Sequence, residues 1–281
     1  MEKICDLHTH SIFSDGTWTP SELIDGAINA GISALALTDH NAVEGLPHFI
    51  DAAAGKDIEA VLGCEFSVDY EEKELHMLGL FIDPKYFPQI TDMMNDVMAR
   101  KEKSNIDLVE SLKNADIILD YDKIKSATPS GKINRAHIAS AMLENGYVGS
   151  VKEAFSRYLK SELGFYKEPK RLSVWETVDY IQSIGAVSVL AHPFLQLDEE
   201  GLVKFLPKAK VYGLIGMECY YSTNDEKQTA DSLRIADEFG LLYSGGSDFH
   251  GTRKPDIELG VGKGNLRIPY DWYLALKEKS K

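Results

Sequence analysis

The feature that most constrains the fold is a repeated alternation between short apolar runs and amphipathic helical segments. Strands are predicted at seven places, residues 3–8, 34–38, 58–64, 75–81, 187–191, 213–218 and 241–245. One predicted helix begins at Pro20, with Thr19 as its N-cap, and ends at Gly31. Another is capped by Ser173 and runs to Gly185. This strand–helix–strand order predicts an α/β fold with parallel strands and crossover helices, either a barrel or a doubly wound sheet.

The stretch from residue 85 to about residue 170 departs from this alternation, because its pattern is helical throughout. We expect a small helical insertion domain at residues 89–170 that packs as a lid over one end of the barrel. The barrel itself would then be discontinuous, formed by residues 1–88 and 171–281. A chain of 281 residues is long enough for one large domain that carries such an insertion.

The amino-acid composition limits which partners the protein can bind and which cellular compartment suits it. A formal net charge of -14 argues against tight, sequence-blind binding of duplex nucleic acid, which requires a basic surface. The three cysteines, Cys5, Cys64 and Cys219, form no C-x-x-C pair and lie in or beside apolar runs, so buried free thiols in a reducing compartment are expected. The sequence shows no secretion signal and no apolar stretch of membrane-spanning length. These observations predict a cytoplasmic protein without a membrane partner.

Side chains that can bind metal ions collect at or just past the C-terminal ends of the predicted strands. They are His8, His10, Asp39, His40, Glu65, His192, Glu218, Asp248 and His250, with His76 on a neighbouring strand. The C-terminal end of the strands carries the active site in parallel α/β folds. His8 and His10 alone would be an even choice between a sheet edge and half of a metal site. Together with the other groups they predict a metal centre.

Seven motifs along the chain resemble, in order, those of the polymerase and histidinol phosphatase (PHP) superfamily. They are Asp6-Leu7-His8-Thr9-His10, Ser14-Asp15-Gly16, Thr38-Asp39-His40-Asn41, Gly63-Cys64-Glu65, His76 before Leu78-Gly79, Ala191-His192-Pro193 and Gly246-Ser247-Asp248-Phe249-His250. The stretch from Asp15 to Pro20 and the Arg135-Ala136-His137 motif resemble the branch of stand-alone nucleotide phosphoesterases. The resemblance implies a distorted seven-stranded β/α barrel. It also implies removal of the 3'-phosphate from nucleoside 3',5'-bisphosphates, and some members of the branch also trim short oligonucleotides from the 5' end.

The resemblance further implies two to three divalent ions and assigns their ligands. His8, His10, Glu65 and Asp248 would hold one ion, Asp15, His40 and His250 a second, and Glu65, His76 and His192 a third, so that Glu65 bridges. Many relatives have His at the position of Asp15. Because a carboxylate favours harder ions, Mn²⁺ or Fe²⁺ is expected at this site, while Zn²⁺ and Mg²⁺ remain compatible with the ligand set.

The chemistry explains why such residues are needed. Three divalent ions beside three carboxylates leave about three net positive charges, which suits a phosphate dianion within an acidic protein. A water shared by two of the cations loses its proton near neutral pH, and this bridging hydroxide is the expected nucleophile. The catalytic residues would be Glu65, Arg135 and His137. Of these, Arg135 and His137 are expected to bind the phosphates of the substrate, and His137 to protonate the leaving group.

Other functional classes share parts of this sequence pattern. Histidinol-phosphate phosphatase stays open as the alternative within the class, because the metal motifs are shared. A metal amidohydrolase also starts a barrel with His-X-His, but the Asp248-Phe249-His250 motif, His76 and the Arg135 motif are surplus to that pattern. A non-catalytic module is disfavoured because all nine ligand positions hold metal-capable groups. The expected partners are a small phosphorylated nucleotide and short single-stranded oligonucleotides, and no sequence pattern specifies an oligomeric state.

Overall fold

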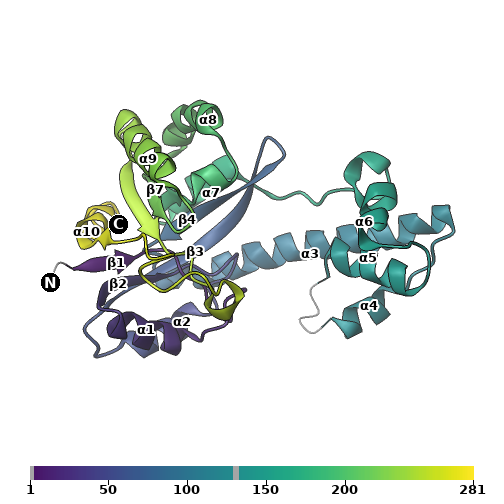
Figure 1. Cartoon of the computed structure of the whole chain (residues 1–281), viewed down its shortest axis with the longest axis horizontal. Helices are drawn as coiled ribbons and strands as arrows, with labels where there is room; N and C mark the ends of the chain where they lie inside the picture. Colours follow the sequence, from purple (N-terminus) through teal and green to yellow (C-terminus); the bar gives the residue numbers. More distant parts are fainter. Residues whose placement is uncertain (1–2, 129–132) are drawn as a thin grey trace. The chain divides into compact units, whose positions relative to one another are not determined.

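The structure, a computed structural model, describes residues 3–128 and 133–281 (Figure 1). Its strands are β1 (Ile4–Asp6), β2 (Ile32–Leu37), β3 (Glu59–Tyr70), β4 (Lys73–Leu80), β5 (Leu172–Ser173), β6 (Val187–Leu190), β7 (Gly216–Tyr221), β8 (Leu242–Gly246) and β9 (Ile268–Pro269). Its α-helices are α1 (Pro20–Asn29), α2 (Leu46–Ala53), α3 (Phe87–Leu112), α4 (Tyr121–Ala127), α5 (Arg135–Glu144), α6 (Val151–Ala154), α7 (Val174–Ser183), α8 (Glu199–Tyr212), α9 (Glu226–Phe239) and α10 (Tyr270–Lys277). Within these two ranges, no helix is both long and apolar enough to cross a membrane.

The chain divides into two compact units. The barrel unit comprises Met1–Asp92 and Leu172–Lys281, and the helical unit comprises Met93–Arg171. The division based on the sequence had set the insertion at residues 89–170. The helical unit has an apolar core of its own, in which Leu112, Ile138 and Met142 are fully buried. Each unit therefore has the buried apolar surface that a separate domain needs.

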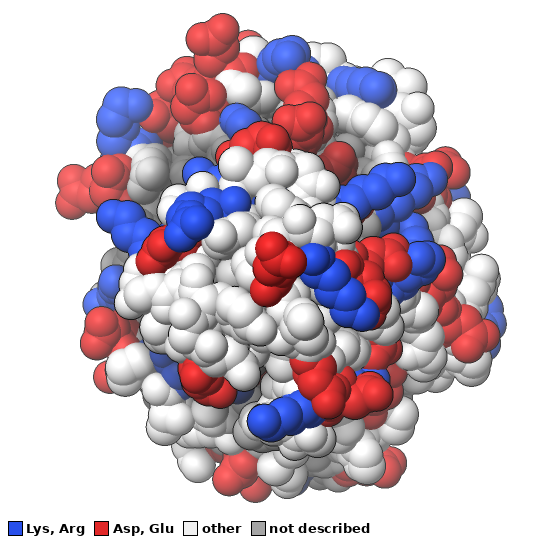
Figure 2. Space-filling view, turned by 90° about the vertical axis from the view of Figure 1, so that its right-hand side faces the viewer, with Lys and Arg blue, Asp and Glu red and all other residues white. Residues whose placement is uncertain are grey.

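The exposed charges of the helical unit are largely paired within its own helices. Lys103 contacts Asp107 and Lys113 contacts Glu110, each at 2.7 Å and on one helical face. On the face shown in Figure 2, Lys and Arg side chains are interspersed with Asp and Glu. Cationic charge on this face is thus neutralised locally and does not form one continuous basic surface.

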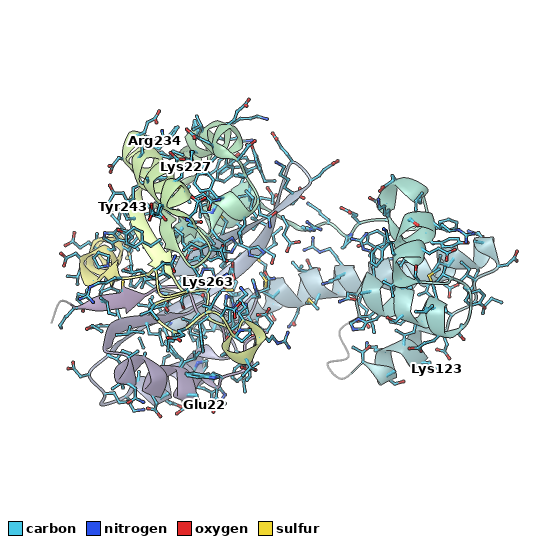
Figure 3. The ribbon with its side chains drawn as sticks, viewed as in Figure 1. Glu22, Lys123, Lys227, Arg234, Tyr243 and Lys263 are labelled. Atoms are coloured by element: carbon cyan, nitrogen blue, oxygen red, sulfur yellow. The ribbon has the colours of Figure 1, made fainter. Side chains whose placement is uncertain are left out.

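The predicted start of the first helix is confirmed in detail. Thr19 Oγ1 accepts a hydrogen bond from Glu22 N at 3.2 Å, and Glu22 Oε2 accepts one from Thr19 N at 2.7 Å. This reciprocal capping box fixes the loop that enters α1, on which Glu22 is labelled in Figure 3. For α7, the predicted start of the helix is correct, but the predicted capping by the Ser173 side chain is wrong. Ser173 is its N-cap residue, but its side chain makes no capping hydrogen bond.

The sheet is a nearly closed barrel, which confirms the predicted fold class. Its strand order is β8-β7-β6-β4-β3-β2-β1-β9, with β5 paired to β3. The sheet curls until β8 meets β1, where Leu7 N donates to Gly245 O at 3.1 Å and Asp248 N donates to His8 O at 2.9 Å. The seven longer strands correspond to the seven predicted ones. No sequence pattern predicts β5 and β9, which have two residues each.

The expectation of parallel strands throughout is wrong at β4. This strand is antiparallel to both of its neighbours, β3 and β6. It follows β3 through a two-residue turn at Glu71 and Glu72, whose φ angles are 49° and 67°. Such turns normally contain Asn or Gly, so the usual sequence signal is missing. As a result β3 continues to Tyr70, and Glu65 lies in the middle of a strand instead of at its end.

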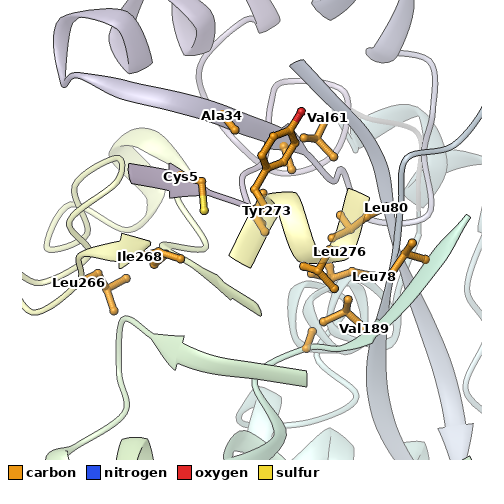
Figure 4. Packing of buried hydrophobic residues seen from close by; sticks show 14 residues of the cluster. Cys5, Ala34, Val61, Leu78, Leu80, Val189, Leu266, Ile268, Tyr273 and Leu276 are labelled. Atoms are coloured by element: carbon orange, nitrogen blue, oxygen red, sulfur yellow. The ribbon is translucent and has the colours of Figure 1, made fainter. Parts of the chain in front are cut away.

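A continuous apolar cluster fills the barrel unit (Figure 4). Tyr273 and Leu276 of α10 are buried in it among strand residues such as Cys5 and Leu78. Burying one such large side chain contributes about 1.5–3 kcal/mol to stability. The cysteines are buried free thiols, as the sequence predicted. This core fixes the strands from which the metal-binding side chains project.

Candidate metal centre

Asp6 joins the first histidine motif to the last strand. The buried Asp6 carboxylate accepts hydrogen bonds from Ser247 N at 2.8 Å and from Gly260 N at 2.9 Å. Burial raises the pKa of Asp6, although the hydrogen bonds from Ser247, Gly260 and His8 oppose that shift. The backbones pack so closely that a Cβ on Gly246 would lie 2.2 Å from His8 Cβ, so glycine is required there. Motifs 241 residues apart in sequence thereby meet at one place.

Four ligand atoms form the first group of the site. Glu65 Oε2 lies 3.1 Å from His8 Nε2 and 3.2 Å from His10 Nε2. Asp248 Oδ1 lies 3.1 Å from His10 Nε2 and 3.6 Å from His8 Nε2. Two ligands on one tetrahedral ion, each about 2.1 Å from it, are separated by about 3.4 Å. The atoms of His8, His10 and Glu65 therefore have the spacing of ligands around a single ion, and Asp248 Oδ1 lies at a similar distance from the two imidazoles.

A second group surrounds Asp15. Asp15 Oδ1 lies 3.2 Å from His250 Nε2 and 4.0 Å from His40 Nε2. The structure adds His10 to this group, because its Nδ1 lies 3.9 Å from the same oxygen. The ligand atoms of these four residues all lie within 4.8 Å of one another. His10 thus presents one ring nitrogen to each of the two groups, and the Asp15 side chain is 40% exposed.

A third group forms around the other oxygen of Glu65. Glu65 Oε1 lies 2.7 Å from His76 Nδ1 and 3.0 Å from His192 Nε2. The opposite oxygen, Glu65 Oε2, contacts the first group and also lies 3.0 Å from His40 Nδ1. Because its two oxygens face different imidazoles, the buried Glu65 carboxylate has the geometry of a bridging ligand.

Buried atoms without partners support the presence of cations. Six atoms of the candidate ligand side chains are buried with no hydrogen-bond partner among the described residues: His8 Nε2, His10 Nδ1, His10 Nε2, His40 Nδ1, Glu65 Oε2 and His192 Nδ1. An unsatisfied buried polar atom costs about 1–3 kcal/mol. Imidazole and carboxylate donors are also the set that binds Mn²⁺, Fe²⁺ or Zn²⁺. The residues present therefore fit divalent cations.

Without cations, the imidazoles and carboxylates stabilise one another's charges. Burial alone would lower the pKa of His10, but its close contacts with the Asp248 and Glu65 carboxylates raise that pKa to about 9. His76 also has a pKa of about 9, because its contact with Glu65 outweighs the effect of burial. Burial opposes ionisation of Glu65 and Asp248, yet the imidazoles, His8 first among them, hold both pKa values below their usual range. Protons and metal ions thus compete for the same nitrogens.

Two further buried carboxylates, Glu218 and Asp39, lie beside the three ligand groups. Glu218 orients ligands: its Oε1 faces His8 Nδ1 at 3.0 Å, and its Oε2 accepts from His192 N at 2.7 Å. Asp39 has a different role. Its carboxylate accepts from Ser11 N at 2.7 Å and from Ser14 Oγ at 2.6 Å. Asp39 therefore holds the loop that leads to Asp15 and makes no hydrogen bond to a ligand imidazole among the described residues.

Two residues outside the predicted ligand set contact the centre. Tyr221 Oη donates a hydrogen bond to Asp248 Oδ2 at 2.8 Å, and Lys254 Nζ donates to the same oxygen at 2.6 Å. Burial and the nearby carboxylates raise the pKa of Tyr221, so the phenol keeps its proton and can donate. Neither residue belongs to a spacing pattern that indicates metal binding, so no sequence signal could have found them.

Arg135 and His137 lie in the helical unit, and their contacts there are defined. Arg135 Nη1 donates to Leu159 O at 3.0 Å, and its guanidinium lies 4.3 Å from the centre of the Tyr166 ring. His137 Nδ1 accepts a hydrogen bond from Asn134 N at 3.1 Å, which caps α5. His137 also lines a cavity of about 480 Å³ between α4 and α5. The predicted contact of these two residues with substrate stays a prediction.

The known proteins that this chain resembles agree in the kind of reaction that their names describe. The PHP domain family matches residues 6–172. A 5'-3' exoribonuclease of Haemophilus influenzae is 32% identical over 251 residues, which cover 89% of this chain and 91% of that protein. A 3',5'-nucleoside bisphosphate phosphatase of Chromobacterium violaceum is 29% identical over 257 residues, which cover 91% of this chain and 90% of that protein. A solved structure from Bifidobacterium adolescentis, proposed to be a metal-dependent phosphoesterase, is 27% identical in sequence and superposes with a TM-score of 0.70. The match covers 99% of this chain and 97% of that chain.

The family match and the geometry of the site agree. The matched segment includes most of the ligand residues, from His8 through His76, and the relatives extend over nearly the whole chain. The imidazoles and carboxylates converge on one rim of a barrel, as hydrolysis assisted by metal ions requires. This chain therefore belongs to the PHP family and is a metal-dependent phosphoesterase.

Proposed function

We propose that this protein removes the 3'-phosphate from nucleoside 3',5'-bisphosphates and also accepts short oligoribonucleotides. The observation that carries the proposal is the convergence of three ligand groups on Glu65 and Asp15. Such a centre can concentrate positive charge beside a phosphate in an otherwise acidic protein. The relatives from Haemophilus influenzae and Chromobacterium violaceum carry names for these two activities and support the choice of substrate.

The ligand assignment is part of the proposal. His8, His10, Glu65 and Asp248 would hold one ion, Asp15, His40 and His250 a second, and Glu65, His76 and His192 a third. Mn²⁺ or Fe²⁺ fits the second group best, because its Asp15 carboxylate favours harder ions. When bound, such ions supply an activated water and neutralise charge that develops on the phosphoryl oxygens.

The protein's own residues would position these ligands and the substrate. Glu218 orients the ring of His8 and anchors the backbone of His192. Asp39 fixes the loop that leads to the partly exposed Asp15, so this carboxylate can face an entering phosphate. Such positioning lowers the entropy that the reacting groups lose when substrate binds.

Arg135 and His137 would recognise the second phosphate of a bisphosphate. Arg135 uses Nη1 on a backbone carbonyl and stacks on Tyr166, which pre-orients the planar guanidinium. Its other N–H groups can then grip a phosphate through parallel hydrogen bonds. Because His137 Nδ1 accepts from the backbone, its proton in the neutral ring lies on Nε2, the atom from which it would protonate the leaving group.

A substrate panel with manganese-loaded protein tests the proposal. The panel holds a nucleoside 3',5'-bisphosphate, a nucleoside monophosphate, histidinol phosphate, a short RNA and an amide such as a dihydropyrimidine. The bisphosphate should give the highest kcat/KM, with free phosphate and a nucleoside 5'-phosphate as products. Asp248→Ala should abolish phosphate release, and release that persisted in this variant would indicate a contaminating phosphatase.

The same panel decides between the alternatives. Preferred turnover of histidinol phosphate would replace the nucleotide assignment but keep the class of reaction. Turnover of the amide alone would make the protein a metal amidohydrolase and overturn the proposal. Release of mononucleotides from the 5' end of the short RNA would support the second activity.

A further inference from the structure

The two oxygens of the Asp248 carboxylate have different surroundings. Oδ1 faces imidazoles, with His10 Nε2 at 3.1 Å. Oδ2 already accepts two hydrogen bonds, from Tyr221 Oη and from Lys254 Nζ. Oδ2 is therefore saturated by protein donors, and only Oδ1 faces the first ligand group.

The two donors differ in charge and in access to solvent. Tyr221 is neutral and 3% exposed. The Lys254 side chain is 37% exposed, although the Asp248 side chain that it contacts is only 5% exposed. An ammonium has three N–H donors, and Asp248 is the partner of Lys254 among the described residues. Lys254 thus brings a cation with free donors to the edge of the metal centre.

The balance of charge at the centre favours a second anionic partner for the Lys254 ammonium. A metal ion on Oδ1 would draw charge from the Asp248 carboxylate and weaken its attraction for Lys254. Tyr221 would still satisfy Oδ2, so the carboxylate does not depend on Lys254 to stay hydrogen-bonded. An incoming phosphate dianion offers the ammonium stronger acceptors at the same edge.

We propose that Lys254 is a substrate-binding residue whose ammonium donates to a non-bridging oxygen of the substrate's phosphate. The inference rests on the proposed function, because it places a phosphate at this metal centre. It extends that function by assigning a phosphate contact to the barrel unit itself, independent of Arg135. Lys254 lies in the short segment after His250, so the last motif would supply both metal ligands and a phosphate ligand.

The test measures phosphate binding without turnover. Inorganic phosphate is titrated calorimetrically into manganese-loaded wild type, Lys254→Met, Lys254→Arg, Tyr221→Phe and Arg253→Met, and the manganese content of each protein is determined. Tyr221→Phe removes the other donor to the same oxygen without changing charge. Arg253→Met removes a neighbouring exposed cation from the same segment.

Lys254→Met should weaken phosphate binding about tenfold or more at unchanged manganese content, as expected for losing a charged hydrogen bond. Lys254→Arg should retain most of the affinity, and the Tyr221 and Arg253 variants should stay within about twofold of wild type. Equal losses in Lys254→Met and Tyr221→Phe, or loss of manganese from Lys254→Met, would show that Lys254 acts only through Asp248 and overturn the proposal. So would an equal loss in Arg253→Met or no binding of phosphate by wild type. Failure of the proposed function would instead appear as absent nucleotide turnover while the phosphate affinities still differed.

Discussion

Two of the proposed metal ligands occupy backbone conformations that are rare outside glycine. The φ angle is 56° at Asp248 and 26° at His192. A left-handed conformation costs a non-glycine residue about 1–2 kcal/mol, so neighbouring contacts must maintain it. The hydrogen bond from His192 N to Glu218 is one such contact, and Glu218 simultaneously faces the ring of His8. One buried carboxylate therefore sets the positions of two ligands.

Glu218→Gln tests this role at the residue scale. An amide can accept through only one atom, so it cannot maintain both contacts. We expect manganese affinity to fall about 10- to 100-fold, as is usual when a residue that orients a metal ligand is changed. Metal titration followed by calorimetry measures the effect, and Glu226→Gln on the exposed start of α9 is the matched control. Unchanged affinity in Glu218→Gln would contradict the role.

The convergence of the candidate ligand residues could be predicted from sequence, because metal-capable side chains gather around strand ends in a recognisable order. Tyr221 and Lys254 could not, since a single tyrosine or lysine has no spacing partner in the sequence. The second contact of His10, through Nδ1 toward Asp15, was also missed. A sequence shows which residue is present but not which ring nitrogen faces which neighbour.

At the scale of elements, the β3–β4 hairpin brings Glu65 and His76 together. Glu65 pairs with Leu78 in the antiparallel register, so His76 lies two residues along on the same face of β4. A slip of one residue would turn His76 to the other face. The sequence indicated both strands but not their antiparallel pairing, because a Glu-Glu turn lacks the residues that normally mark one.

Replacing this turn should stabilise the protein. The double variant Glu71→Asn/Glu72→Gly puts residues that tolerate positive φ at the two positions that require it. We expect about 1 kcal/mol of added stability, which corresponds to about 2 °C in Tm for a chain of this size. Thermal denaturation measures the change. Lys73→Gly, within β4, is the control and should lower Tm, whereas a lower Tm in the double variant would argue against strain at the turn.

At the scale of the whole molecule, the buried charges make stability depend on pH. The pKa values of His10 and His76 are about 9, above the ordinary 6.5, so their stabilising effect is complete below pH 6.5 and is lost as pH rises through 9. Glu65 and Asp248 have lowered pKa values, so their contribution is lost only in acid. In EDTA, the free energy of unfolding should therefore fall between pH 6.5 and 9.

Bound manganese should reverse this trend, because the ion binds deprotonated imidazoles. The rise in Tm on adding manganese should grow from pH 6 to 9. Parallel thermal scans in EDTA and in manganese measure it. A rise in Tm that does not vary with pH would show that protons do not compete with the ion.

Arg135 recognises the second phosphate of the substrate in our proposal. Arg135→Ala should raise KM for a nucleoside bisphosphate by about tenfold or more, because a charged hydrogen bond to phosphate is lost, while KM for a simple monoester changes little. Steady-state kinetics on both substrates measure the difference. Arg157→Ala, which removes an exposed arginine paired with Glu153, is the control. Equal effects of Arg135→Ala on the two substrates would contradict the proposal that Arg135 binds the second phosphate.

The hydrogen bonds from Ser247 and Gly260 to Asp6 have a consequence for biosynthesis. A nascent chain that has reached residue 240 already contains the first histidine motif but neither Asp248 nor the groups that hold Asp6 in place. Its His8 and His10 can face Glu65 but lack their second carboxylate, Asp248, until β8 docks beside β1. Metal acquisition in this protein is therefore expected to follow translation of the last ligand motif, so that a prematurely terminated chain would not retain its ion.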